Sequence, residues 1–401
     1  MIIKGKDINM ARKLKVCHVI TRMIVGGAQE NTLLSCAGLL EHGHEVTLVT
    51  GPSPGPEGEL LSRSCPEGLK IIEVPELVRE LSPLKDWRAY RRLLEIFTAE
   101  KFDVVHTHAS KAGIVGRIAA RKAGVPYVVH TVHGQAFFDG QFFLLNWGYI
   151  IAERCAAKYC DKIYAVAQAM IEQCVAAKVA PREKYQVVYS GMDLEAFLNA
   201  RPEAELRESL GIPDGTPVVG CIARLFPLKG HDKLIESAPE IIKSVPDVKF
   251  LLVGNGILRE ALDARIREMG IEKHFVFTGL VSPSEVCRYT ALMDVLAHLS
   301  LREGLPRVAV QALASGVPVV AYPLDGTPEV VIDGETGRLC KVGDCGEIAA
   351  SIVGLLKDEK TRREMGRRGQ EAVKRKFDWR RMSDVLEEDY VNGLTVKGVV
   401  L

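Results

Sequence analysis

The feature that constrains this chain most is a regular alternation of short apolar runs with longer amphipathic stretches. Runs rich in β-branched residues, such as 14–21 and 44–50, are typical of strands, and the stretch 28–43 between them has helical spacing. The same rhythm restarts near residue 218. Strands connected through helices pair in parallel, and a parallel sheet is covered by helices on both faces. The sequence therefore predicts an α/β fold with two Rossmann-like, doubly wound domains.

The chain length agrees with two domains, since 401 residues exceed one ordinary core. A polar segment with Pro and Gly at 201–217 marks the change between them. We expect an N-terminal domain over 1–195, a C-terminal domain over 196–376, and a C-terminal helix over 377–401 that returns to the N-terminal domain. Ligands of such sheets bind beyond the carboxyl ends of the strands, so we expect the two domains to face a central cleft.

Composition narrows the function classes. Hydrophobic residues make up 47% and charged residues 26% of the chain, as in soluble globular proteins. The net charge of +1 offers no basic field for nucleic acid, and the ten cysteines show no metal-binding spacing. Residues 1–15 lack the apolar core of a secretory signal, and no run reaches the ~18–20 apolar residues of a membrane span. We expect a cytoplasmic protein with no metal and no nucleic-acid partner.

Two loops after predicted strands carry residues suited to phosphate. Gly26 and Gly27 let the backbone approach a ligand, and the helix behind them offers N–H groups. Arg224 and Lys229 lie five residues apart after a buried strand. There the planar guanidinium of arginine can form two parallel hydrogen bonds to phosphate oxygens, and the compact ammonium group of lysine can pair with the phosphate charge. The alternatives are a plain strand-to-helix turn for the first loop and two solvated cations for the second.

A third loop precedes a helix of small apolar residues. Pro306 fits the first helical turn, where it costs no hydrogen bond, and the N–H groups of Gly304 and Leu305 then form a neutral cradle for an anion. If the helix includes them, Glu303 and Gln311 lie roughly 12 Å apart along it. Gly304 and Gln311 would then share one helix face.

Glu303 and Gln311 are thus separated by more than the about 5 to 9.5 Å of a glycosidase carboxyl pair. At that spacing, Glu303 and Gln311 could each form hydrogen bonds with hydroxyls at opposite ends of one long ligand. A nucleotide sugar has this shape. The alternatives are a helix-capping carboxylate for Glu303 and a satisfied polar residue for Gln311.

With these residues in place, the sequence resembles the retaining glycosyltransferases of family GT4, which have the GT-B fold. The resemblance rests on GGAQ after the first strand, HTVHG in the first half, RLFPLKG, and EGLPRVAVQALASGVPVVA followed by DGTPEVVIDGETG. Their order and spacing cover nearly the whole chain. The resemblance implies an enzyme that moves a sugar, with retention of anomeric configuration and without a metal, from a nucleotide diphosphate-sugar of UDP or GDP type to an acceptor hydroxyl.

The resemblance also implies roles for the phosphate-binding residues. Arg224 and Lys229 would bind the diphosphate and stabilise it as it leaves, which replaces the metal of other transferases. Gly27 and the amides of Gly304 and Leu305 would support the same group.

Three further roles concern the sugars and the acceptor. Glu303 would bind hydroxyls of the donor sugar, and His133 would lie beside the reacting sugar, with a structural histidine as the alternative. His108 and Lys111 would line the acceptor side, with structural or solvated roles as alternatives. The family has a second Glu where this chain has Gln311, an amide that still bonds a ribose diol but lacks the charge.

The resemblance implies a place in cell-surface polysaccharide or glycolipid biosynthesis, with a carbohydrate or lipid-linked acceptor. The aromatic stretch 137–149 would then contact the inner face of the cell membrane peripherally, or form a core helix on the sheet.

Rival functions are a nucleotide-sugar epimerase of GT-B fold and a non-catalytic sugar-nucleotide-binding homologue, which Gln311 permits. A dehydrogenase is disfavoured because the glycines at 254–259 lack the third position of a dinucleotide fingerprint.

Overall fold

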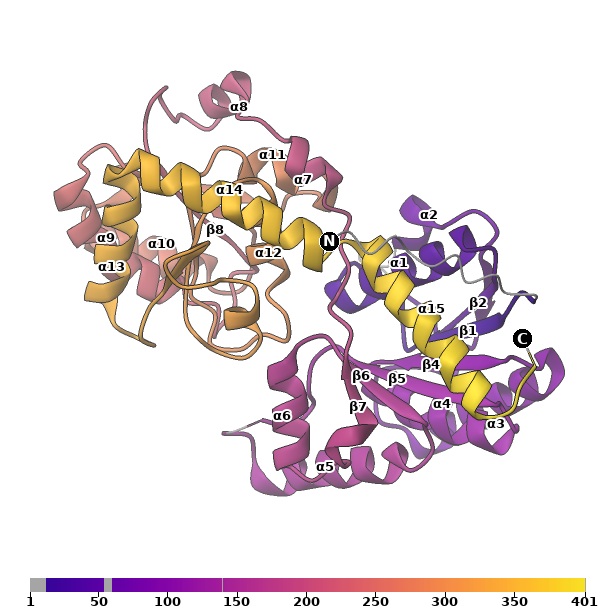
Figure 1. The fold of residues 1–401 in the computed structure, drawn as a ribbon. Coiled ribbons are helices and arrows are strands. Elements are labelled where there is room, and N and C mark those ends of the chain that lie inside the picture. The colour runs from indigo at the N-terminus through magenta and orange to yellow at the C-terminus, as the bar shows by residue number, and fades with distance from the viewer. Residues whose placement is uncertain (1–11, 54–59, 139, 401) are drawn as a thin grey trace. The chain divides into compact units, whose positions relative to one another are not determined.

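The structure is a computed structural model that describes residues 12–53, 60–138 and 140–400 (Figure 1). Most of the segment on which the absence of a secretory signal was predicted, 1–11, lies outside the described residues. The chain divides into two compact units, of which unit 1 comprises 1–192 with 379–401 and unit 2 comprises 193–378. The sequence had placed the two changes of domain at 195 and 376.

Unit 1 contains a parallel seven-stranded sheet with the order β3-β2-β1-β4-β5-β6-β7. Its strands are β1 (Lys15–Ile20), β2 (Glu45–Thr50), β3 (Lys70–Glu73), β4 (Val104–His108), β5 (Tyr127–Val132), β6 (Lys162–Ala165) and β7 (Tyr185–Val187). Its helices are α1 (Gly27–Glu41), α2 (Leu60–Ser64), α3 (Pro83–Glu100), α4 (Ser110–Lys122), α5 (Phe143–Ala157), α6 (Gln168–Ala176) and α15 (Trp379–Val396). The central strands are buried along almost their whole length, as expected for a parallel sheet covered by helices on both faces, and their buried residues include several histidines.

Unit 2 contains a parallel six-stranded sheet with the order β10-β9-β8-β11-β12-β13. Its strands are β8 (Val218–Ile222), β9 (Lys249–Val253), β10 (Phe275–Gly279), β11 (Val295–His298), β12 (Val319–Ala321) and β13 (Gly337–Leu339). Its helices are α7 (Glu195–Asn199), α8 (Ala204–Ser209), α9 (His231–Ser244), α10 (Arg259–Glu268), α11 (Val286–Thr290), α12 (Arg307–Ala314), α13 (Cys345–Lys357) and α14 (Glu359–Lys376). The predicted α/β fold with two doubly wound, parallel sheets is confirmed.

Each sheet has one point where the winding reverses, and it positions the candidate ligand loops. In unit 1 the reversal lies between β1 and β4, and in unit 2 it lies between β8 and β11. At such a switch point the connections of two neighbouring strands leave toward opposite faces of the sheet and open a crevice at its carboxyl edge. Gly26, Lys229 and Glu303 lie in loops that follow three of these four strands, and His108 is the last residue of the fourth, β4.

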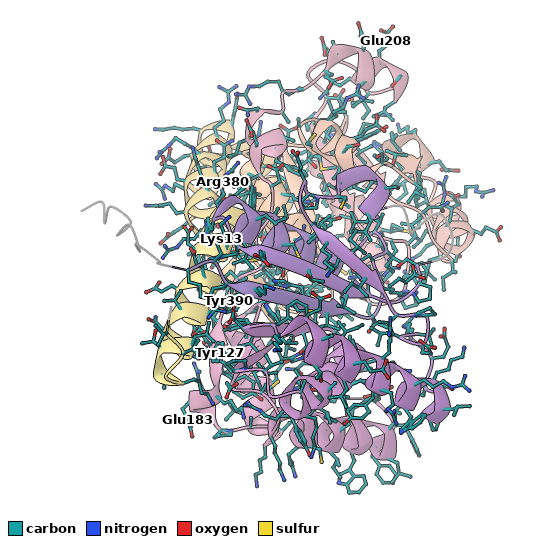
Figure 2. All side chains as sticks on the ribbon, turned by 90° about the vertical axis from the view of Figure 1, so that its right-hand side faces the viewer. Lys13, Tyr127, Glu183, Glu208, Arg380 and Tyr390 are labelled. Carbon is teal, nitrogen blue, oxygen red and sulfur yellow. The ribbon has the colours of Figure 1, made fainter. Side chains whose placement is uncertain are left out.

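The C-terminal helix α15 packs inside unit 1. Its apolar side chains, which include Trp379 and Leu386, join the core cluster that contains strands β1 and β4. Asp389 on the same helix accepts a hydrogen bond from the Tyr127 hydroxyl at 2.7 Å and pairs with Lys162 at 3.0 Å. In Figure 2, Tyr127 and Tyr390 are labelled where the yellow helix lies beside the strands of unit 1. The last part of the sequence is therefore a structural element of unit 1.

The small residues of α12 have a packing role. Helix α14 crosses α12 so closely that a Cβ atom at Gly366 would lie 1.9 Å from the Gly316 carbonyl oxygen. A Cβ atom at Gly369 would lie 2.7 Å from the Leu313 side chain. The alanines of α12 and the glycines of α14 thus bring two helices together behind the loop that precedes α12.

Candidate functional site

The two loops at the switch point of unit 2 are bonded to each other. The Leu228 carbonyl, in the loop after β8, accepts hydrogen bonds from the Leu301 amide at 2.8 Å and the Ser300 hydroxyl at 3.2 Å, both in the loop after β11. Gly230 has a φ of +76°, and a Cβ atom there would lie 2.1 Å from the Leu299 carbonyl oxygen. Glycine is therefore required where the two loops meet.

This contact brings Lys229 and Glu303 together. Lys229 Nζ donates to Glu303 Oε1 over 2.6 Å, and both side chains are about a quarter exposed. His298, at the end of β11, is buried with Nε2 3.9 Å from the same carboxylate oxygen. Burial lowers the pKa of His298, and the Glu303 carboxylate opposes that effect only in part. The site thus holds one ammonium group, one carboxylate and one neutral imidazole at the carboxyl edge of the sheet.

The loop 303–306 is fixed by its neighbour after β12. The Glu303 amide donates to Asp325 Oδ2 at 2.8 Å, and the Gly326 amide donates to the Gly304 carbonyl at 3.2 Å. Within the described residues the Gly304 and Leu305 amides make no hydrogen bond with protein. Two N–H groups beside Lys229 and Glu303 are the arrangement that an anion can use.

The start of helix α12 differs from the prediction. The helix begins at Arg307, and Pro306 is its N-cap residue with φ −74° and ψ 86°. Gly304 therefore belongs to the loop and does not share a helix face with Gln311. The ring of Pro306 restricts its φ, and the two residues before Leu305 are bonded to the loop at 325–326. The chain therefore stays extended for one turn longer than predicted. Gln311 lies in the middle of α12, half-buried, and its side chain makes no hydrogen bond with a described residue.

Arg224 lies in the same loop as Lys229 but is exposed. Its guanidinium is 5.4 Å from the centre of the Phe226 ring, a cation–π distance. The glycines after β9 support this loop: a Cβ atom at Gly254 would lie 2.1 Å from the Ala223 carbonyl oxygen, and one at Gly256 would lie 2.4 Å from the Leu225 carbonyl oxygen. These two glycines therefore allow the loop after β9 to pack closely against the backbone of the loop after β8.

In unit 1, Gly26 and Gly27 lie where the connection from β1 enters α1. Gly27 is the first residue of α1, and Gly26 is its N-cap residue, with an extended φ of 174° that other residues can also adopt. The Gly26 carbonyl accepts from the Glu30 amide at 3.0 Å. A Cβ atom at Gly26 would lie 2.8 Å from Gln29 Oε1, a flexible neighbour. The loop has the helix N-terminus that an anion site needs.

Three histidines of unit 1 form a hydrogen-bonded chain that the sequence did not reveal. His18 Nδ1 lies 2.9 Å from His108 Nε2, and His108 Nδ1 lies 3.0 Å from His133 Nε2. The strands align them, because His18 of β1 pairs with His106 of β4, and His108 pairs with Thr131 of β5. The family resemblance predicts His108 on the acceptor side, but in the structure its side chain is fully buried and both ring nitrogens bond other histidines. His133 is half-buried at the end of this chain.

Within the described residues, one group has the geometry to share a metal ion. It comprises His18, His106 and His108, whose ligand atoms lie within 4.8 Å of one another. His106 already bonds the Tyr390 and Thr131 hydroxyls at 2.6 Å each, and His18 and His108 bond each other. Burial lowers the pKa of His18 to about 3 and the pKa values of His106 and His108 well below their ordinary value. These rings form a neutral, hydrogen-bonded core.

Lys111, also predicted on the acceptor side, is engaged within unit 1. Its ammonium pairs with Asp86 Oδ1 at 2.6 Å and donates to the Glu80 carbonyl. Only 11% of its side chain is exposed. Lys111 therefore ties the start of α4 to the start of α3.

The aromatic stretch 137–149 is largely exposed. Phe143 is 69% and Trp147 63% exposed, and their neighbours Phe142, Leu144 and Leu145 are exposed as well. The alternative prediction of a core helix is therefore wrong for this first half of α5. Leu81, Leu84 and Trp87 at the start of α3 are also exposed. We call these eight side chains, which lie at or just before the starts of α3 and α5, the apolar rim.

Comparison with known proteins agrees with this fold. Residues 202–372 match the family model described as glycosyl transferases group 1, and residues 26–191 match the glycosyl transferase 4-like domain. The chain is 31% identical over 351 residues to the UDP-Gal:alpha-D-GlcNAc-diphosphoundecaprenol alpha-1,3-galactosyltransferase of Escherichia coli, covering 86% of this chain and 89% of that protein.

Two other likenesses extend the comparison. The chain is 28% identical over 365 residues to the GDP-mannose-dependent alpha-(1-6)-phosphatidylinositol monomannoside mannosyltransferase of Mycolicibacterium smegmatis, covering 88% of this chain and 92% of that protein. The crystal structure of Anabaena HepE in complex with UDP superposes with a TM-score of 0.79 at 23% identity, covering 94% of this chain and all of that one.

The fold and the relatives together define a glycosyltransferase of the GT-B type. The chain belongs to the glycosyl transferases group 1 family and has the GT4-like N-terminal domain that accompanies it.

Proposed function

We propose that this enzyme is a retaining, metal-independent glycosyltransferase that moves a sugar from a UDP- or GDP-sugar to a lipid-linked or carbohydrate acceptor. Unit 2 holds the donor, and unit 1 holds the acceptor. The observation that carries the proposal is the pairing of Lys229 with Glu303 beside the Gly304 and Leu305 amides at the switch point of unit 2.

That arrangement matches the charge that develops in glycosyl transfer. As the sugar leaves, the diphosphate gains negative charge, and a fixed ammonium group with two N–H donors stabilises it most at that stage. Glu303 engages Lys229 through Oε1, and a carboxylate has further acceptor sites that can bond sugar hydroxyls. Arg224 is exposed at the same loop and can swing from Phe226 onto the phosphates.

Retention and the acceptor class are supported by the relatives. The names of the two curated relatives specify α-linked products and acceptors that are built on lipids. Retention is the outcome of their reactions when the donor sugar is itself α-linked. We assign this chain the same course and a place in cell-surface polysaccharide or glycolipid biosynthesis.

A panel of nucleotide sugars tests the proposal. Incubated without added metal and with EDTA, the protein should release a nucleoside diphosphate from one UDP- or GDP-sugar and raise its Tm with that donor, because a ligand that binds only the folded state stabilises it. Proton NMR of the product should show the anomeric configuration of the donor. An inverted product, or an epimerised nucleotide sugar, would refute retention or transfer. Binding without turnover across acceptors would favour a non-catalytic homologue.

The apolar rim suggests how a lipid-linked acceptor reaches the enzyme. Helices α3 and α5 both pack against α4, and both begin at the carboxyl edge of the sheet. Four exposed basic residues, Lys85, Arg88, Arg91 and Arg92, follow on α3, and the Arg91 guanidinium lies 5.4 Å from the Trp87 ring. Exposed aromatics beside basic side chains suit the interface of an anionic membrane. The described residues contain no helix with the length and apolarity to cross a bilayer.

We therefore expect the protein to bind the inner face of the cell membrane peripherally. The double variant Phe143→Ser/Trp147→Ser should lose most of its co-sedimentation with vesicles that contain phosphatidylglycerol, since both side chains are more than 60% exposed. Leu280→Ser is the matched control, because Leu280 is 85% exposed in unit 2. If the wild-type protein, the double variant and Leu280→Ser bind vesicles equally, the apolar rim does not contact the membrane.

A further inference from the structure

The histidine chain of unit 1 has a direction that the structure allows us to assign. Its links are His18 Nδ1 to His108 Nε2 at 2.9 Å and His108 Nδ1 to His133 Nε2 at 3.0 Å. A neutral imidazole has one N–H donor and one acceptor nitrogen, so each link needs the donor on one side only. Two proton arrangements satisfy both links, and they are opposite in direction.

The buried end of the chain distinguishes the two arrangements. His18 Nε2 is buried and makes no hydrogen bond with any described residue. If the chain ran from His133 toward His18, this nitrogen would carry an N–H without an acceptor. If it ran outward, the same nitrogen would be an acceptor without a donor. A buried N–H with no partner is the rarer of the two in proteins.

The outward direction fixes each proton. His18 Nδ1–H donates to His108 Nε2, His108 Nδ1–H donates to His133 Nε2, and the proton of a neutral His133 stands on Nδ1. We propose, on the basis of the function above, that His18 and His108 are positioning residues that hold His133 as an Nδ1–H hydrogen-bond donor. With Nε2 accepting from His108 and Nδ1 protonated, a neutral His133 has no ring lone pair left, so it does not accept the proton of the acceptor hydroxyl.

Packing around the chain keeps it rigid. His18 and His108 are fully buried, and their ring planes lie 16° apart. The His106 ring lies 4.1 Å from the His108 ring, centre to centre, and is held by the Tyr390 hydroxyl of α15 and the Thr131 hydroxyl of β5. A charge on His108 would be buried beside these rings, and burial holds its pKa well below the ordinary value. His18 and His108 therefore stay neutral, and each keeps one ring hydrogen.

The tautomer can be read without substrate. In long-range 1H–15N correlation spectra of the full-length protein labelled with 15N-histidine, each neutral ring shows which nitrogen carries the proton. The His133 resonances are identified by their loss in His133→Asn. We expect a protonated Nδ1 and an unprotonated Nε2. A protonated Nε2 on His133 in the wild-type protein would overturn the inference.

A matched pair of substitutions tests the positioning role. In His108→Asn the side-chain amide lies near the place of Nδ1 and can still donate to His133, whereas in His108→Gln it lies near the place of Nε2 and cannot. His108→Asn should keep the His133 tautomer, and His108→Gln should lose it together with about 10- to 100-fold of kcat, the usual effect of removing an orienting partner. Equal loss in both variants at equal Tm would contradict a positioning role.

Two controls keep the test decisive. If either His108 variant fails to fold, His18→Asn and His18→Gln form the same pair one ring further in. His130→Gln is the control on β5, because His130 bonds Thr107 and is outside the chain; it should leave the His133 tautomer unchanged. The tautomer of His133 can be measured even if the protein is inactive with every nucleotide sugar. An active enzyme in which His133 has the other tautomer would overturn this inference but leave the proposed function in place.

Discussion

Replacing Lys229 with alanine is expected to lower kcat by about 100- to 1,000-fold, the range seen when one fixed donor to a developing negative charge is removed. Lys229 Nζ is fixed at 2.6 Å from Glu303 Oε1, in a loop held by the Leu228 carbonyl and by Gly230. Because the diphosphate gains charge as the sugar leaves, the loss should fall on kcat more than on the donor KM.

The fold should survive this substitution. The Lys229–Glu303 pair is partly exposed, and such pairs contribute at most about 1 kcal/mol. Lys229→Arg should recover part of kcat, because arginine keeps the charge but spreads it over a planar fork. Lys233→Ala is the matched control: Lys233 lies four residues further on, pairs with Glu236 at 2.7 Å and is outside the site. Steady-state kinetics in which Lys229→Ala behaves like Lys233→Ala would contradict the assignment of the diphosphate to Lys229.

Replacing Glu153 with glutamine is expected to lower the free energy of unfolding of unit 1 by about 3 kcal/mol or more, as when one partner of a buried ion pair is removed. Arg117 on α4 is fully buried, and its guanidinium meets Glu153 of α5 at 2.7 Å and the Gly113 carbonyl at 2.7 Å. Glutamine keeps the shape but leaves the buried charge without a carboxylate. Urea unfolding followed by far-UV circular dichroism measures the loss.

Two variants show whether the buried charge is the cause. Arg117→Met/Glu153→Met should recover most of the loss, because replacing both charges with apolar side chains of similar size removes the unpaired charge. Glu95→Gln breaks the exposed pair with Arg92 and should change the free energy of unfolding by about 0.5 kcal/mol or less. If Glu153→Gln has no larger effect than Glu95→Gln, the pair does not hold α4 to α5.

The architecture was predictable because both periodicities are strong. Strands such as β8 are short apolar runs, and the amphipathic stretches between strands give the helices. Short elements are harder to predict: β3 is an edge strand of four residues with little burial, and α6 has only nine residues. The break between α13 and α14 is marked mainly by Asp358, which caps α14 by accepting from the Thr361 amide. Elements of this length produce little periodic signal.

The candidate site was predictable in its residue types and less so in its geometry. Glycines, a lysine and a glutamate after buried strands indicated loops at the carboxyl edge, and the structure places Lys229 and Glu303 in contact. The hydrogen bond from Glu303 to Asp325 joins two loops 22 residues apart, and the approach of His298 to Glu303 depends on how the loop after β11 folds back, so no local sequence pattern predicts either contact. The same holds for His18, whose partner His108 lies 90 residues away on a neighbouring strand of the switch point.

The exposure of the apolar rim was also hidden from the sequence. A run of Phe, Leu and Trp has the composition of a core helix, and only the packing of α5 against α4 decides which residues face water. The start of α12 moved for a different reason, because contacts of Glu303 and Gly304 with the loop at 325–326 hold the chain ahead of Pro306 out of the helix.

The central claim is that unit 2 neutralises a nucleotide diphosphate with protein groups. A crystal structure of the enzyme with its nucleotide-sugar donor, grown in the presence of EDTA, tests this most directly. We predict diphosphate oxygens within hydrogen-bonding distance of Lys229 Nζ and of the Gly304 and Leu305 amides. The Glu303 carboxylate should accept hydrogen bonds from hydroxyls of the donor sugar. A donor bound elsewhere, with the Lys229–Glu303 pair unchanged and no phosphate beside it, would contradict the account.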